Sequence, residues 1–381
     1  MSEWKKVSLS EMGIVSRGKS KHRPRNDTRL YGGRYPFIQT GDIGAAGLYV
    51  TDYSQTYNEE GLAQSKLWEK NTLCITIAAN IADTALLAFP ACFPDSIMGF
   101  VPHKDVANVK YVKYCFDILK KDCQQISQGT AQDNLSWKKL STIKFPCPPL
   151  EVQNRIATIL SRYDLLIENY QKQIKLLEEA AQRLYKEWFI DLHFPGHENT
   201  KIVDGVPEGW EKKKVGEISE FKRGKTITKK DIVEGNVPVV AGGLEPAYYC
   251  NKHNTTSRVI TISGSGANAG FTRLYYEKVW ASDCSFADTN TTKWLHFVYC
   301  FLQSSKSAID NMQKGAAQPH VYAKDINALD IMVPEAGLLS RFEDFASTYF
   351  NKVQSLQSQL HLLTEARDRL LPKLMSDEFK V

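Results

Sequence analysis

The sequence predicts an α+β protein in which two similar mixed α/β domains are separated by an antiparallel coiled coil of two long helices. Three observations predict this pseudo-two-fold internal repeat. Apolar residues recur at steps of four and three through residues 152–189, which is the heptad pattern of a coiled-coil helix. The same pattern returns 186 residues later. Short motifs of the first half also reappear in the same order in the second half.

The apolar seam of the first helix consists of Ile156, Leu160, Tyr163, Ile167, Tyr170, Ile174, Leu177, Ala181, Leu184 and Trp188. The offset of 186 gives the second seam, Phe342, Ala346, Tyr349, Val353, Leu356, Leu360, Leu363, Arg367, Leu370 and Leu374. Arg367 is its one polar member. A lone helix cannot bury such a stripe, so we expect pairing, either within the chain or with a second copy. Thirty-eight residues give a helix of roughly 57 Å, a length suited to a spacer.

Length and composition bound the class of protein. A chain of 381 residues is expected to hold two or three domains, and 43% hydrophobic with 24% charged residues is typical of a soluble globular protein. The longest apolar run, residues 73–82, is too short to span a membrane, and no signal region follows Met1, so we expect a cytoplasmic location. Eight scattered cysteines without a C-x-x-C pair predict core thiols in a reducing compartment and no metal site.

A cluster of basic residues lies within residues 17–34, near the start of the chain. It contains one acid, Asp27, and enough glycine and proline to exclude a helix. Its basic members are Arg17, Lys19, Lys21, Arg23, Arg25, Arg29 and Arg34. The cluster is either a loop that contacts nucleic-acid phosphates or a solvated surface loop.

The elements are expected in the following order. The first domain covers residues 1–149, with short strands near residues 35–39, 47–53 and 73–77 and a helix near 110–125. The first spacer helix covers residues 150–190. A connector rich in proline and glycine, residues 191–209, ends it. The second domain then covers residues 210–334, and the second spacer helix covers 335–381.

The repeat is carried by short motifs. Arg223-Gly224-Lys225 lies 206 residues after Arg17-Gly18-Lys19, whereas residues 260–262 lie 185 residues after 75–77. The offset therefore varies in the globular parts and is constant in the helices. This difference favours a molecular ruler, with variable domains on a spacer of fixed length.

The sequence contains no constellation of catalytic residues. It lacks a P-loop and the Asn-Pro-Pro-aromatic tetrapeptide of DNA-base methyltransferases. Gly264, Gly266 and Gly270 have the wrong spacing for a dinucleotide loop, and no G-x-S-x-G elbow frames Ser263 or Ser265. We therefore expect a protein that is not an enzyme and holds no cofactor or metal.

Polar loops of the two domains supply side chains suited to reading base edges, because Arg and Lys pair with guanine and Asn and Gln with adenine. The same residues could equally form structural turns. Outside the basic cluster, the predicted DNA-binding residues are Gln128, Thr130, Gln132, Asn134, Arg223, Lys225, Lys314, Gln318 and His320.

Several segments resemble the DNA-specificity subunit of type I restriction-modification systems, and the resemblance covers nearly the whole chain. The first helix begins with P-P-L-E-V-Q-N-R-I-A at residues 148–157, similar to the family's P-P-L-x-E-Q-x-x-I-A pattern with the acid shifted one place. Further matching segments lie in and around the connector, namely Trp188-Phe189, Phe194-Pro195-Gly196-His197 and Pro207-Glu208-Gly209-Trp210. The second helix departs from this pattern at residues 334–339, P-E-A-G-L-L.

The resemblance implies a non-catalytic specificity subunit that binds double-stranded DNA and has no membrane partner. Each domain would read one half of a split target, and the coiled coil would fix the gap. Two methyltransferase (modification) subunits would carry S-adenosylmethionine, and motor-nuclease (restriction) subunits would use ATP and Mg. The alternative is a coiled-coil scaffold with two protein-binding heads, which predicts no salt-sensitive affinity for DNA.

Overall fold

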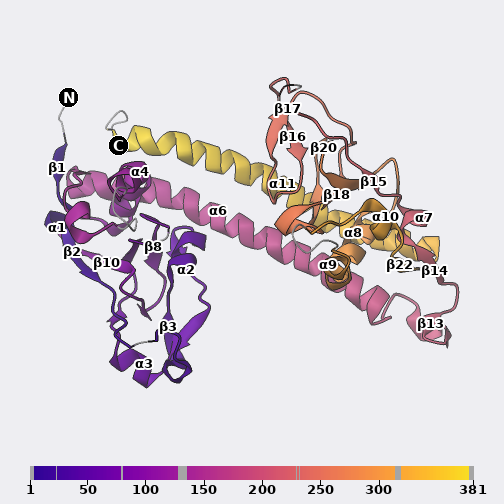
Figure 1. Cartoon of the computed structure of the whole chain (residues 1–381), viewed down its shortest axis with the longest axis horizontal. Helices are drawn as coiled ribbons and strands as arrows, with labels where there is room; N and C mark the ends of the chain where they lie inside the picture. Colours follow the sequence, from indigo (N-terminus) through magenta and orange to yellow (C-terminus); the bar gives the residue numbers. More distant parts are fainter. Residues whose placement is uncertain are drawn as a thin grey trace. The chain divides into compact units, whose positions relative to one another are not determined.

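The computed structural model describes residues 4–22, 24–78, 80–127, 135–228, 230, 232–313 and 319–376. They form two compact units (Figure 1). Unit 1 contains Met1–Gln171 and Gln359–Val381, and unit 2 contains Lys172–Ser358. The two long helices contribute residues to both units.

Unit 1 has two main sheets and one short strand pair. The five-stranded sheet has the order β2 (Gly13–Arg17), β10 (Ile97–Pro102), β7 (Leu73–Thr76), β8 (Thr84–Leu87) and β4 (Tyr49–Val50). The four-stranded sheet has the order β5 (Gln55–Tyr57), β3 (Tyr31–Phe37), β9 (Ala91–Cys92) and β6 (Leu67–Trp68), and β1 (Lys5–Val7) pairs with β11 (Phe145–Cys147). The helices are α1 (Leu9–Met12), α2 (Thr40–Ala45), α3 (Glu59–Ala63), α4 (Val109–Ser127) and α5 (Trp137–Leu140).

Unit 2 repeats this plan in a shorter form. Its four-stranded sheet has the order β15 (Lys222–Arg223), β21 (Cys284–Asp288), β18 (Val259–Ser263) and β19 (Thr272–Tyr275). Its three-stranded sheet is β17 (Tyr248–Cys250), β16 (Val237–Val240) and β20 (Trp280–Ala281), while β14 (Glu211–Lys214) pairs with β22 (Asp330–Val333) and β12 (Ile202–Val203) with β13 (Val206–Pro207). The helices are α7 (Val215–Ile218), α8 (Leu295–Ser304), α9 (Lys306–Asn311) and α10 (Ala323–Asn327).

The internal repeat predicted from sequence is a repeat of topology. The order β2-β10-β7-β8 corresponds to β15-β21-β18-β19, and β5-β3-β9 corresponds to β17-β16-β20. Each set includes one parallel pair, β3 with β9 and β16 with β20. Unit 1 additionally has α2, β4, α3 and β6 between Arg17 and Ile75. These insertions explain why the offset between the halves changes within the globular parts.

The first long helix begins at a local sequence that favours a helix start. Helix α6 (Leu150–Tyr185) follows Pro148-Pro149, which suit a helix start because proline lacks the N–H that would be unpaired there. A π-helical turn, η2 (Lys186–Ile190), extends it. This wider turn buries both Trp188 and Phe189, although the heptad pattern predicts only Trp188 inside. Helix α11 covers Ala336–Met375.

Pairing of the two helices is antiparallel in each unit. In unit 1, Ile156 and Leu160 of α6 belong to the same core as Leu374 of α11. In unit 2, the other end of α6 meets the start of α11, because the Trp188 ring lies 6.0 Å from that of Phe342. Every predicted seam position is buried or half-buried. The helices therefore pair within one chain.

Each globular part is held to a long helix by a polar side chain that caps a neighbouring helix. In unit 1, buried Gln153 of α6 accepts from Asn108 N at 3.0 Å, just before α4, and donates to Val106 O and Pro148 O. In unit 2, Glu343 of α11 accepts from Phe297 N at 2.8 Å in the first turn of α8. These bonds satisfy amides that a helix leaves unpaired at its start.

The described residues meet neither the requirements for a membrane-spanning helix nor those for a cluster of metal-binding side chains. Among the described residues, no helix is both long and apolar enough to cross a membrane. Nor does any group of three or more His, Cys, Asp or Glu side chains in these ranges suit a metal ion. All eight cysteines are free thiols, and Cys147 alone among them is not fully buried.

Candidate nucleic-acid interface

At the first Arg-Gly-Lys motif the backbone passes directly against the backbone of residues 93–97 in unit 1. We call this close approach a crossing. Gly18 N donates to Ile97 O at 2.8 Å, and Lys19 N donates to Phe93 O at 3.0 Å. A Cβ atom on Gly18 would lie 2.2 Å from Pro94 O, so only glycine fits at this crossing. The crossing leaves Arg17 exposed and Lys19 half-buried on either side of the glycine.

The second motif forms the same crossing in unit 2. Gly224 N donates to Cys284 O at 2.8 Å, and Lys225 N donates to Ala281 O at 2.9 Å. A Cβ on Gly224 would lie 2.4 Å from Ser282 O. Arg223 and Lys225 are both exposed. The repeat therefore preserves a constrained glycine with a cation on each side.

The basic loop of unit 1 is anchored beyond this crossing. Ser65 Oγ donates to Lys19 O at 2.6 Å, and Gln64 Oε1 accepts from the backbone N–H groups of Lys21 and His22. Gln64 and Ser65 directly follow α3, and α3 and β3 lie at the end of unit 1 farthest from α6 (Figure 1). The loop is therefore held beside α3, at the end of unit 1 remote from α6.

Only part of the basic cluster is available for an external anion. Arg25 pairs with Asp95, Arg29 with Asp27 at 2.7 Å, and Arg34 with Glu59 at 3.1 Å. The sequence showed one acid within the cluster, and the fold brings Asp95 and Glu59 to it from elsewhere. Within the described ranges, Arg17, Lys19 and Lys21 have no ion pair. They are the cations of this loop best placed for phosphate contacts.

The Asp27 carboxylate organises the same loop. Hydrogen bonds from the Arg29 side chain and backbone, with a further one from His22, hold the pKa of Asp27 well below its usual range. Its Oδ1 also accepts from Arg29 N at 3.0 Å, as an N-cap does at the start of η1 (Thr28–Leu30). Arg29 thus shapes the loop instead of offering a free charge.

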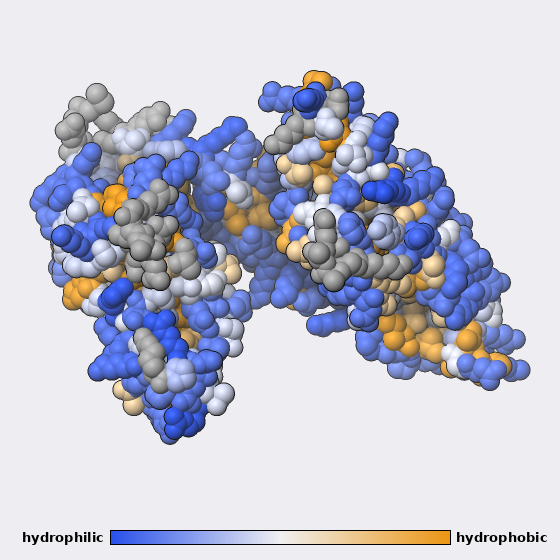
Figure 2. All heavy atoms as spheres, viewed as in Figure 1, coloured by the Kyte–Doolittle hydropathy of each residue, from blue (hydrophilic) through white to orange (hydrophobic). Residues whose placement is uncertain are grey.

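A polar cavity of about 300 Å³ opens beside the loop. Its lining includes Arg25, Asn26, Gln39, Gln55 and Ser96. Gln39 Nε2 donates to Gln55 Oε1 at 2.8 Å, and both residues are exposed. Sequence reasoning missed these two glutamines, because they come from separate segments that only the fold brings together. Figure 2 shows a mainly hydrophilic visible surface on the part of unit 1 that contains α3 and β3.

The remaining predicted DNA-binding residues fall into two groups. His320 is half-buried, lies in a bridge with Ser265, and stacks its ring on Tyr322 with centroids 5.9 Å apart. The others lie outside the described residues, namely Arg23, Gln128, Thr130, Gln132, Asn134, Lys314 and Gln318.

The serines considered for hydrolase chemistry have other hydrogen-bond partners. Ser263 Oγ donates to Gly242 O at 3.0 Å, and Ser265 Oγ donates to Asp283. Their hydroxyls therefore support the loops beside β18.

Comparison with known proteins identifies relatives along the whole chain. The family described as type I restriction modification DNA specificity domain matches residues 1–179 and 207–338. The MjaIX type I restriction enzyme specificity subunit of Methanocaldococcus jannaschii is 27% identical over 410 residues, covering 100% of this chain and 94% of that protein. The MjaVIII specificity subunit of the same organism is 32% identical over 240 residues, covering 62% of this chain and 53% of that protein.

The fold has a counterpart among solved structures. The type I restriction-modification S subunit from M. genitalium aligns with a TM-score of 0.68 at 19% identity, over 97% of this chain and 96% of that chain. The family match along most of the chain places this protein in the class of non-catalytic specificity subunits of type I restriction-modification systems, and the two mixed α/β parts with two long helices agree with that class. The chain belongs to the type I restriction modification DNA specificity family.

Proposed function

We propose that each globular domain, residues 1–149 and residues 210–334, reads one half of a bipartite double-stranded DNA target. The observation that carries this proposal is the repeated crossing at Gly18 and Gly224, where the same backbone hydrogen bonds hold a cation on each side. Duplicated phosphate contacts would set each domain in the same register on DNA, while the surrounding loops differ and read different bases.

The paired helices set the gap between the half-sites and present a docking surface for two methyltransferase subunits. S-adenosylmethionine would act in those subunits, and ATP with Mg in the motor-nuclease subunits. Membership of the specificity family supports this assignment of DNA reading to the present chain and of catalysis to its partner subunits. The helix seams support the ruler, because the offset between the two seams is constant while the globular parts differ by insertions.

Replacing Arg17 and Lys19 by alanine is expected to weaken DNA binding regardless of base sequence. Each cation that contacts a phosphate releases counterions on binding, so the slope of log K against log salt should fall by about 1 for each one removed. Fluorescence anisotropy of a labelled duplex over a series of salt concentrations measures this slope. The pair Arg223→Ala and Lys225→Ala should give a similar loss.

Arg29→Ala is the matched control, because Arg29 is paired with Asp27. It removes one positive charge from the same loop, half of what the Arg17 and Lys19 pair removes, and should leave the slope nearly unchanged instead of lowering it by about 1. If DNA affinity is absent at every salt concentration, or does not respond to salt, the protein-binding scaffold becomes the better account.

Replacing Gln39 and Gln55 by leucine is expected to weaken discrimination at one half-site while retaining non-specific affinity. The paired amides lie in the polar cavity and offer the donor and acceptor that adenine recognition uses. The loss should be about tenfold or more for the cognate duplex, within the usual 1–3 kcal/mol for one bidentate contact. Competition between cognate and scrambled duplexes measures it, with exposed Gln171→Leu as control. An unchanged cognate preference would exclude the cavity from base reading.

A further inference from the structure

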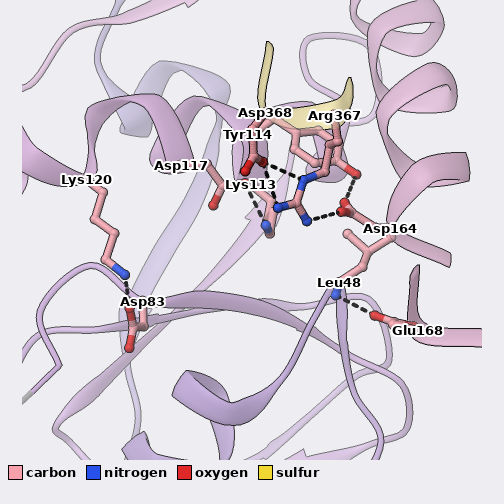
Figure 3. Close-up of polar contacts among 10 residues, drawn as sticks. All are labelled: Leu48, Asp83, Lys113, Tyr114, Asp117, Lys120, Asp164, Glu168, Arg367 and Asp368. Carbon is pink, nitrogen blue, oxygen red and sulfur yellow. Dashed lines mark hydrogen bonds and ion pairs between the residues drawn. The ribbon is translucent and has the colours of Figure 1, made fainter. Parts of the chain in front are cut away.

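An ion pair between a half-buried arginine and a buried aspartate occupies the one polar position of the second seam. Arg367 Nη1 of α11 lies 2.9 Å from Asp164 Oδ1 of α6, and the Asp164 side chain is 5% exposed. The Tyr114 hydroxyl of α4 donates to Asp164 Oδ2 at 2.5 Å. Figure 3 shows the three side chains converging from three helices of unit 1. We refer to Tyr114, Asp164 and Arg367 as the polar junction.

The surroundings of the polar junction favour a protonated Tyr114 hydroxyl and a charged Arg367 side chain. Burial and the neighbouring Asp164 carboxylate raise the pKa of Tyr114, so its hydroxyl stays protonated and remains a donor. Burial alone would lower the pKa of Arg367, but hydrogen bonds to Asp164 and Asp368 outweigh it and raise this pKa. Such a pair is destabilising when one partner is missing, whereas well-packed apolar residues can replace both at little cost.

The corresponding positions of unit 2 are apolar. The helix offset of 186 takes Asp164 to Phe350, and it takes Ala181 to Arg367. Phe350 and Ala181 are 1% and 0% exposed. The Phe350 ring stacks on His296 with centroids 4.9 Å apart. The two helix junctions of this duplicated chain therefore use different chemistry at equivalent positions.

This difference matters because α6 and α11 have the same heptad pattern and could each pair with themselves. Two α6 helices from two copies, paired antiparallel in this register, would place Asp164 opposite Ala181. Two α11 helices would place Arg367 opposite Phe350. The first arrangement buries the Asp164 charge with no partner in the facing helix. The second leaves half-buried Arg367 with Asp368 of its own helix but with no partner in the facing helix. The pairing of α6 with α11 in one chain matches Asp164 with Arg367.

We propose that the polar junction selects α11 of the same chain as the partner of α6 and disfavours pairing between like helices of two copies. A single buried polar pair can specify register and partner in a coiled coil at some cost in stability. The functional consequence rests on the proposed bipartite reading. Pairing between like helices would bring two copies of the same globular domain together, and the target would become symmetric.

The test replaces the polar junction of unit 1 by apolar side chains, as found at the equivalent positions Phe350 and Ala181 of unit 2. Asp164→Phe and Arg367→Ala give unit 1 the apolar residues found at these positions, and Tyr114→Phe removes the hydroxyl that would lose its acceptor. The full-length variant and the wild type are unfolded in denaturant and refolded at increasing chain concentration, and size-exclusion chromatography with light scattering measures the products. The wild type is expected to refold as a monomer, and the variant should give several-fold more dimer as concentration rises.

Two further variants separate selection from folding. Arg367→Ala alone leaves Asp164 without its cation in every pairing. It should therefore lower the melting temperature and, because no pairing is then favoured by charge, also raise the dimer fraction. Asp164→Leu with Arg367→Leu and Tyr114→Phe supplies a second apolar junction if the Phe version does not fold, as judged by circular dichroism. Monomer fractions equal to wild type in the folded apolar variants at all concentrations overturn the proposal, and so does failure of both to fold.

Methylation separates this proposal from the function on which it rests. In cells that carry the modification subunits, the dimer-forming variant should methylate targets made of one half-site and its inverted copy. Dimers that methylate no symmetric target would uphold the role of the polar junction and count against independent reading by the two domains.

Discussion

Deleting one heptad from both long helices is expected to shorten the gap in the DNA target by about three base pairs and to leave both half-sites unchanged. Seven helical residues span about 10 Å, and each base pair adds about 3.4 Å. Suitable segments are residues 170–176 and 354–360, which lie between the facing pair Asp164 with Arg367 and the facing pair Trp188 with Phe342. Sequencing of methylated sites in cells carrying the variant and its partner subunits measures the gap.

The matched control removes residues 170–176 alone. It shifts the register of α6 against α11, so Asp164 and Arg367 cannot both keep their partners if Trp188 stays near Phe342, and stability and methylation should both fall. The ruler is contradicted if the double deletion changes the half-sites while the gap stays the same, because the helices would then affect base reading instead of distance.

Exchanging residues 1–148 for the corresponding part of another family member is expected to change only one half-site. The second globular domain has its own sheets, its own crossing at Gly224 and its own cap from Glu343, so its base contacts should not depend on the first. Methylation mapping of the exchanged chain should show one new half-site, one old half-site and an unchanged gap.

The exchanged segment includes residues that contact α6, so these contacts must be preserved in the chimaera. Tyr114 contacts Asp164, and Leu48 N donates to Glu168 at 2.6 Å (Figure 3), so the incoming domain must offer equivalent partners to α6. Restoring a tyrosine at the position of Tyr114 is the control for a chain that folds poorly. Changes in both half-sites of a folded chimaera would show that the domains do not read independently.

The sequence predicts the repeat and the pairing of the helices because both depend on patterns of apolar residues. A stripe such as Ile156 and Leu160 needs a partner, and only the segment 186 residues later offers a matching one. The topology of the sheets was only partly predictable, since two-residue strands such as β4 and β6 are too short to show a period.

Polar partners far apart in the chain could not be predicted from the sequence. Arg367 was recognisable as the exception in its seam, but its partner Asp164 lies outside the seam of the other helix. Similarly, the acid that neutralises Arg25 is Asp95, which reaches the loop only when the sheets form. Charge counted along the sequence therefore overstated the positive charge that the basic loop presents.

The glycine at each crossing also marks a boundary for engineering. Because Gly18 and Gly224 leave no space for a side chain, each fixes where the chain leaves one sheet to begin its exposed loop. New loop sequences grafted after these glycines would start from a fixed backbone position, so libraries of altered DNA preference can vary the loops and keep the scaffold constant.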